Sequence, residues 1–172
     1  MKKIIPLTAP ILFLAFGFFL IGQVLPKSLM DQWEDVESEI KKGLPKTAIE
    51  KIDPLIKQAL KDGSHAVAIR AICQKINLEG AIQGNKAEEK IARLEEEITK
   101  APEALKPMMR AVLSNWYWQY FQQNRWRFAQ RTRTAEAPGE DITTWDLSRI
   151  LSEIDKQFQK TLSYHEVLKK EA

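Results

Sequence analysis

The sequence contains only one cysteine and two histidines among its 172 residues. A single cysteine excludes an intrachain disulfide and any zinc site built from several thiolates. The histidines, His65 and His165, lie far apart in the sequence, and neither is beside Cys73. Because no nucleophile–base pair or ligand cluster can be assembled from these residues, we expect no enzymatic activity, no metal and no cofactor.

The sequence also lacks a strong excess of one charge. It has 26 Lys and Arg against 23 Asp and Glu, and two of the bases, Lys2 and Lys3, precede a segment without acids. The rest of the chain, from residue 27, carries 24 bases and 23 acids and is close to neutral. The pI near 8.9 is therefore no argument for a nucleic-acid partner.

The N-terminus has the pattern of a membrane-directed leader. Lys2 and Lys3 precede an apolar stretch over residues 4–25, whose longest unbroken run, residues 11–21, has eleven residues. That run fits the ~7–15-residue core of a secretory signal peptide, whereas the full stretch approaches the ~20 residues that cross a bilayer. We expect residues 1–26 to be a signal peptide or a membrane anchor. The alternative is a buried N-terminal helix.

Charges around the leader predict the side of the membrane on which the rest of the chain lies. Residues 27–42 carry five acids and three lysines, whereas the bases of the leader precede its apolar run. By the positive-inside bias, residues 27–172 are expected on the extracytoplasmic side. The protein is thus expected to be exported to the periplasmic side of the inner membrane, with residues 4–25 as its membrane contact.

Apolar residues after the leader recur every three or four positions, and no stretch alternates long enough to indicate a strand. The pattern predicts helices over residues 29–43, 44–63, 64–80, 85–100, from Pro107 to at least Gln122, and over about 144–161. Pro54 is expected to kink the second helix or to restart it with Asp53 as N-cap. Short Gly or Asn turns predict an all-α domain over residues 27–172, with antiparallel hairpins stacked as in tetratricopeptide-like solenoids.

One segment concentrates aromatic and arginine side chains. Residues 116–128 hold seven of the eleven aromatic residues outside the leader, and five Arg lie in residues 110–133 without an acid. Three interpretations compete: base stacking and phosphate contacts with nucleic acid, a buried helix face, and Arg bonded to helix-end carbonyls and acids. The neutral chain disfavours the first. We predict a structural segment made of Trp116, Tyr120, Phe121, Arg125, Trp126, Arg127, Arg131, Arg133 and Trp145.

Particular contacts follow from that prediction. Trp116, Tyr120 and Phe121 are expected to be buried, and Trp126 is expected to pack near Trp145. The arginines are expected to be satisfied by helix-end carbonyls or by Glu140, Asp141 and Asp146. Elsewhere, Cys73 is expected to be a small buried hydrophobic residue. A set of glutamates is expected to form a solvated face rather than catalytic pairs: Glu88, Glu89, Glu95, Glu96 and Glu97.

The run from Leu113 to Phe128, then Arg131-Thr132 and the later stretch of residues 141–147, resembles the N-terminal helical region of large bacterial alpha-2-macroglobulin-family proteins. The resemblance covers most of residues 29–168. It implies an envelope protein whose helical region precedes β-sandwich macroglobulin domains and, in many members, a thioester domain with a Cys-Gly-Glu-Gln motif. Such proteins are expected to trap attacking proteases. Here Cys73 is followed by Gln74, so no thioester is expected and no residue role carries over.

The resemblance implies a non-enzymatic exported module that docks or spaces a larger protein at the membrane. A capping-box pattern at Ser163 and Glu166 would open a further helix, so the chain is expected to be a fragment or truncated form. The alternative is a free-standing helical-repeat adaptor of the cell envelope. In both cases the expected partner is a protein, either downstream macroglobulin domains or an envelope protein. Neither a nucleic acid nor a small-molecule substrate is expected.

Overall fold

The computed structural model describes residues 27–84, 86–131, 139, 141–164 and 169. These residues form the helices α1 (Leu29–Lys41), α2 (Pro45–Lys61), α3 (His65–Ile82), α4 (Ala87–Lys100), α5 (Lys106–Gln130) and α6 (Leu147–Leu162), with a short 3-10 helix η1 (Ile142–Thr144) before α6. No strand occurs within these ranges, so the all-α prediction is confirmed. The expected leader, residues 1–26, lies outside the described residues. None of the described helices is long and apolar enough to cross a membrane.

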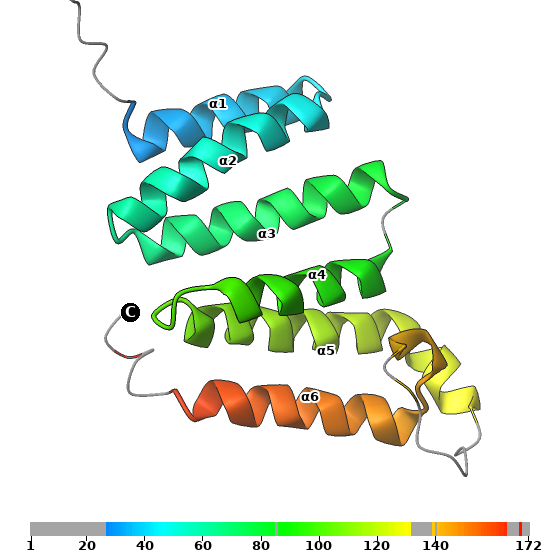
Figure 1. Cartoon of the computed structure of the whole chain (residues 1–172). Coiled ribbons are helices and arrows are strands. Elements are labelled where there is room, and N and C mark those ends of the chain that lie inside the picture. The colour runs from blue at the N-terminus through cyan, green and yellow to red at the C-terminus, as the bar shows by residue number, and fades with distance from the viewer. Residues whose placement is uncertain (1–26, 85, 132–138, 140, 165–168, 170–172) are drawn as a thin grey trace, which may run out of the picture.

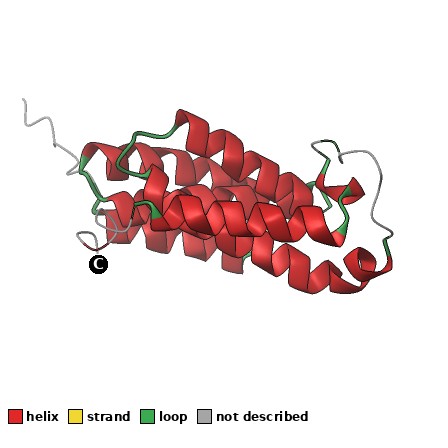
Figure 2. Ribbon diagram, turned by 90° about the horizontal axis from the view of Figure 1, so that it is seen from below, coloured by secondary structure: helices red, strands yellow, loops and turns green. Residues whose placement is uncertain are grey.

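Consecutive helices run antiparallel and follow one another from α1 at one edge to α6 at the other (Figure 1). Each helix packs mainly against the helices that precede and follow it in the sequence. Seen from below, the helix axes are roughly aligned and the connecting loops gather at the two ends of the molecule (Figure 2). Short connections enforce this order, because a turn of a few residues can only return the chain beside the helix it has just left.

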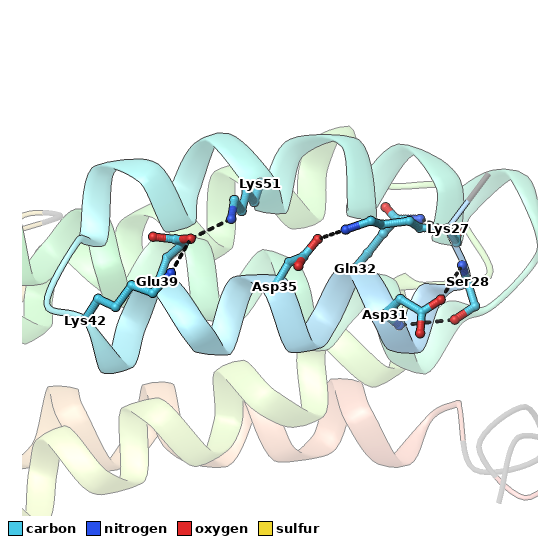
Figure 3. Close-up of polar contacts among 8 residues, drawn as sticks. All are labelled: Lys27, Ser28, Asp31, Gln32, Asp35, Glu39, Lys42 and Lys51. Atoms are coloured by element: carbon cyan, nitrogen blue, oxygen red, sulfur yellow. Dashed lines mark hydrogen bonds and ion pairs between the residues drawn. The ribbon is translucent and has the colours of Figure 1, made fainter. Parts of the chain in front are cut away.

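The start of α1 is held by a capping box (Figure 3). The backbone N–H of Asp31 donates to Ser28 Oγ at 3.1 Å, and the backbone N–H of Ser28 donates to Asp31 Oδ2 at 3.2 Å. Gln32 Nε2 donates to the carbonyl of Lys27 at 2.9 Å, and Lys27 Nζ forms an ion pair with Asp35. These bonds satisfy backbone groups that a helix N-terminus leaves open. They also fix the chain immediately before α1 to the helix.

Polar side chains join α1 to its neighbours. Glu39, only 8% exposed, accepts from Lys51 of α2 at 2.6 Å and from Lys42 at 3.2 Å (Figure 3). The hydrogen bonds from Lys51 and then Lys42 lower the pKa of the Glu39 carboxyl. Arg70 of α3 lies 3.9 Å from the centre of the Trp33 ring, a cation–π geometry. The α1 helix is therefore anchored by charge as well as by burial.

Glycines end the first two helices as the sequence predicts. Gly43 and Gly63 have φ of +72° and +68°, and both turns carry the paired hydrogen bonds of a Schellman motif. In the second turn, Ser64 N–H donates to the Ala59 carbonyl at 2.8 Å and Gly63 N–H donates to the Leu60 carbonyl at 3.3 Å. These left-handed positions set the hairpins α1–α2 and α2–α3.

Some boundaries differ from the predicted ones. The α2 helix is continuous through Pro54, so of the two expected alternatives, a kink or a restart, the restart at Asp53 is wrong. The α3 helix continues past Gly80 to Ile82. The last helix begins at Leu147 rather than near Thr144, because Asp146 accepts from the backbone N–H of Arg149 at 2.7 Å and acts as its N-cap.

Two apolar clusters form the core. The smaller joins α1, α2 and α3 around Trp33, Val36, Ile52 and Leu55. The larger extends from α2 and α3 to α6, and its largest fully buried side chains are Leu94, Leu105, Met109, Leu113, Phe128 and Ile150. Removing this apolar surface from water is the main driving force for folding. The periodicity of residues 144–161 predicts that Phe158 is buried together with Ile150 and Ile154, but Phe158 is 42% exposed, so this prediction is wrong for Phe158.

A substitution at the α2–α3 turn tests whether the left-handed glycine is required. A Cβ at Gly63 would meet nothing within 4 Å, so Gly63→Ala should cost only backbone strain, about 1–2 kcal/mol. Gly63→Asn should cost less, since Asn enters the left-handed region more readily. Urea denaturation of both variants measures this difference. Equal stability of Gly63→Ala and wild type would contradict the assigned turn geometry.

Candidate docking groove

A half-open groove of about 520 Å³ lies between the α2–α3 hairpin on one side and α4 with the start of α5 on the other. It occurs where α3 meets α4, the loosest packing between consecutive helices. The apolar part of its lining comes from three places: α2, α3 and the connection that leads into α5. These residues are Ile56, Leu60, Ile72, Ile76, Ala101, Pro102 and Leu105.

The charged rim of the groove is largely paired. Asp53 accepts from Lys75 at 2.6 Å, Glu79 from Arg93 at 2.7 Å, and Glu96 from Lys100 at 2.6 Å. The Asp53 hydrogen bond raises the pKa of Lys75, and the Lys100 hydrogen bond lowers the pKa of Glu96. These two bonds favour the charged forms of Lys75 and Glu96 near neutral pH.

The groove is better suited to apolar contacts than to catalysis. The lining contains no hydroxyl or thiol nucleophile, and its charges are already compensated. A small polar ligand would find few free groups to orient it, which a ligand pocket normally supplies. An apolar side chain of another polypeptide could fill the lining without breaking an ion pair. The groove therefore has the properties of a docking surface.

The cysteine of the chain, Cys73 on α3, is half-buried and packs against the larger apolar cluster. Burial raises the pKa of its thiol to about 11, so the reactive thiolate is scarce at neutral pH. Within the described part of the chain, no group of three or more His, Cys, Asp or Glu could hold a metal ion. His165 lies outside the described residues.

The aromatic half of the predicted structural segment lies mostly in the core. Tyr120 and Phe121 are 2% and 7% exposed, so their predicted burial is confirmed. Their rings contact Phe128, with ring centres 6.0 Å and 6.1 Å away. Trp116 is only half-buried and packs at the edge of the larger cluster. The buried-face interpretation therefore holds for most of these residues.

The expected contact between Trp126 and Trp145 is wrong. Trp145 is 4% exposed and stacks on Tyr117, with ring centres 6.3 Å apart and an interplanar angle of 4°. Trp126 is 75% exposed. The reason is the length of α5, which continues to Gln130. Within a continuous helix, Trp126 lies about 200° around the axis from the buried Phe128 and therefore faces solvent.

The arginines of the segment make different contacts from one another. Arg131 Nη1 donates to the Trp145 carbonyl at 2.9 Å, which is the predicted bond to a helix-end carbonyl because Trp145 follows η1. Arg127 donates to the Tyr120 hydroxyl and lies 5.3 Å from the Phe128 ring centre. Arg125 is exposed. Arg133 lies outside the described residues.

The acids expected to pair with these arginines act mainly as caps. Asp141 accepts from the backbone N–H of Thr143 at 2.9 Å, and Asp146 caps α6. The hydroxyl and backbone bonds from Thr143 are the main reason that the pKa of Asp141 is lowered, while Arg131 and Arg127 contribute less. Glu140 lies outside the described residues. Local capping therefore replaces the predicted ion pairs at Asp141 and Asp146.

Sequence reasoning missed one contact, between Glu95 and Tyr117. The buried Tyr117 hydroxyl donates to Glu95 Oε1 at 3.0 Å. Burial raises the pKa of Glu95, and nearby Glu153 adds to the increase. Glu95 is therefore not part of a fully solvated face. Its position four residues after the core residue Ile91 is the signal that could have placed it at the α4–α5 interface.

Comparison with known proteins identifies no family for this chain. No protein-family model matches the chain, and neither a curated protein nor a solved structure matches it.

A pair of tryptophan substitutions tests the corrected geometry. Trp145→Ala removes a buried ring and its hydrogen bond to the Gly139 carbonyl, and should cost about 3–5 kcal/mol of unfolding free energy. Trp126→Ala should change stability by no more than about 0.5 kcal/mol, because the ring is exposed. Chemical denaturation measures both. A similar loss in the two variants would contradict the assigned faces of α5.

The half-buried carboxyl of Glu95 on α4 gives a pH-dependent prediction. Because the folded-state pKa of Glu95 is raised, its ionisation costs stability as pH rises above the unfolded value near 4.5. Glu95→Gln keeps an acceptor for Tyr117 but removes the charge. This variant should melt at a higher temperature than wild type at pH 7, and the gain should vanish below pH 4.

The matched control for this experiment is Glu96→Gln. Glu96 is exposed and its pKa is lowered by Lys100, so its neutralisation should not raise the melting temperature at pH 7. A gain of the same size in both variants would attribute the effect to net charge and not to the α4–α5 interface.

Proposed function

We propose that this chain is a non-enzymatic, exported helical module that binds protein, with the docking or spacing role of the N-terminal region of a bacterial alpha-2-macroglobulin-like envelope protein. The observation that carries the protein-binding part is the half-open groove between α3 and α4, with its apolar lining and paired rim. The likeness in residues 113–147 supports the envelope context.

The groove favours a polypeptide over other ligands. Its rim charges already compensate one another, so binding energy would come from apolar side chains, which dominate the centres of protein interfaces. Leu60 is 36% exposed at the groove and offers such a contact to a partner. In a docking module, the natural occupant is a segment of the macroglobulin domains that the module would support.

A second candidate is a free-standing helical-repeat adaptor of the envelope. The packing of each helix mainly against its sequence neighbours favours it, because solenoid proteins are built in this way and present extended binding surfaces. The two candidates differ in the partner: a macroglobulin-domain polypeptide in the first case and an unrelated envelope protein in the second.

Export is tested with reporter fusions. The leader pattern in residues 1–26 and the acidic start of the following chain lead us to expect that a reporter active only outside the cytoplasm will be active when fused after residue 45. A cytoplasm-active reporter at the same position should be silent. The reverse result would remove the exported location from the proposal.

Groove binding is tested by photo-crosslinking in intact cells. A photoreactive residue replaces the exposed rim residue Lys57 in the full chain, and adducts are identified by mass spectrometry. We expect one discrete adduct with a macroglobulin-domain polypeptide. Leu60→Glu should abolish it, because the charge enters the apolar lining.

The control for groove binding is Leu44→Glu. Leu44 is 46% exposed in the α1–α2 turn, away from the groove, and this substitution should leave the adduct intact. An unrelated envelope protein with the same sensitivity to Leu60→Glu would favour the adaptor. No adduct, or loss in both variants, would argue against the groove as the binding site.

A further inference from the structure

The last helix carries a row of exposed apolar side chains. Leu147, Leu151, Phe158 and Leu162 of α6 are 37%, 42%, 42% and 60% exposed. Their spacing of four, seven and four residues places them on one face of the helix. This row, the α6 stripe, adjoins the face that packs into the core through Ile150 and Ile154.

The two edges of the molecule differ in this respect. The α6 helix is the last of the series and lies at its edge (Figure 1). At the opposite edge, α1 exposes charged residues such as Asp31, Glu34 and Lys41. The outer face of α1 is thus largely charged, whereas that of α6 is apolar.

The spacing of the α6 stripe is symmetric. Its two outer residues and its two inner residues share one midpoint, between Ile154 and Asp155. Two antiparallel copies of α6 related by a two-fold axis at this midpoint place Leu147 opposite Leu162 and Leu151 opposite Phe158. A self-complementary surface of this kind is what an isologous contact requires. We propose that α6 docks against α6 of a second copy of this chain, in antiparallel orientation.

Charges beside the α6 stripe permit this contact. Arg149 and Lys156 are turned toward Glu153, with N–O distances of 3.7 Å and 3.1 Å, so they lie away from the stripe. The free edge of the stripe carries Ser148, Ser152 and Gln159, and Asp155 is its one acid. Across the proposed axis the two Asp155 side chains lie opposite each other and form one like-charge contact, whereas the rest of the stripe meets without opposing charges.

The size of the surface sets the strength of the association. The α6 helix has sixteen residues and is about 24 Å long. Ser114 of α5 contacts Thr161 at 3.1 Å, so Trp118, one turn further along α5, lies near the level of Phe158. Trp118 is 42% exposed and is a further uncovered aromatic side chain of the neighbouring helix. A contact of one to two helix widths buries less surface than the ~800 Å² per partner of a stable complex. The proposed dimer is therefore reversible.

Cysteine crosslinking of the full chain in intact cells tests both the contact and its direction. Across the proposed axis, two copies of residue 155 are separated along the helices by about 1.5 Å, and two copies of residue 148 by about 20 Å. With a short thiol-to-thiol crosslinker, Asp155→Cys should give a covalent dimer and Ser148→Cys should not. Wild type, whose half-buried Cys73 has a raised pKa, should remain uncrosslinked.

A second substitution in the Asp155→Cys chain shows whether the α6 stripe makes the contact. Leu151→Glu should abolish the crosslinked dimer, because it places a charge in the apolar seam. Met30→Glu is the matched control, since Met30 is 68% exposed on α1, and it should leave the dimer unchanged. Circular dichroism of the purified full-length variants checks that each keeps its helical content.

Three outcomes would overturn the proposal. Equal crosslinking of Ser148→Cys and Asp155→Cys would indicate a parallel pair or random collision. Crosslinking of Asp155→Cys to a different protein, without a homodimer, would make a partner helix the occupant. A cysteine at position 155 that neither crosslinks nor reacts with a membrane-impermeant maleimide, in cells whose outer barrier is open, would make the lipid surface the occupant.

Discussion

The burial of α5 between α4 and α6 is the contact on which most of the structure depends. Leu113, Tyr117 and Tyr120 are each no more than 3% exposed, and they supply much of the larger apolar cluster. Polar bonds align the same helix, with Ser114 contacting Thr161 and Tyr117 donating to Glu95. Because helices otherwise contact mainly their sequence neighbours, weakening α5 would separate α6 from the rest.

Charge in this protein is mostly compensated within the chain. Glu39 and Glu153 are 8% and 4% exposed, and each is bonded to lysine. Such pairs offset the cost of burying a carboxylate but add little net stability. With the rim of the α3–α4 groove paired as well, electrostatic attraction contributes little to recognition. The apolar lining of the groove and the α6 stripe are therefore the surfaces from which binding energy can come.

These two surfaces lie on different helices and suit different partners. The groove is a concave site between α2, α3 and α4 that accepts side chains, whereas the α6 stripe is a linear row along one helix. A docking module with both could hold a partner polypeptide while pairing reversibly with its own copy. The capped and ion-paired start of α1 fixes residues 27 and 28 to this helical unit.

The sequence by itself determined the helical class, most helix boundaries to within a few residues and the ends at Gly43 and Gly63, because periodicity, caps and left-handed turns are local properties. The end of α5 at Gln130 was not determined in this way. Tertiary packing decided which sides of the helices are covered. Aromatic residues surround much of α5, so spacing alone could not distinguish the buried Phe128 from the exposed Trp126. Phe158 follows Ile154 by four residues, so periodicity places both on one side of α6. Ile154 is 5% exposed and Phe158 is 42% exposed, because a neighbouring helix buries only the part of a wide apolar face that it touches.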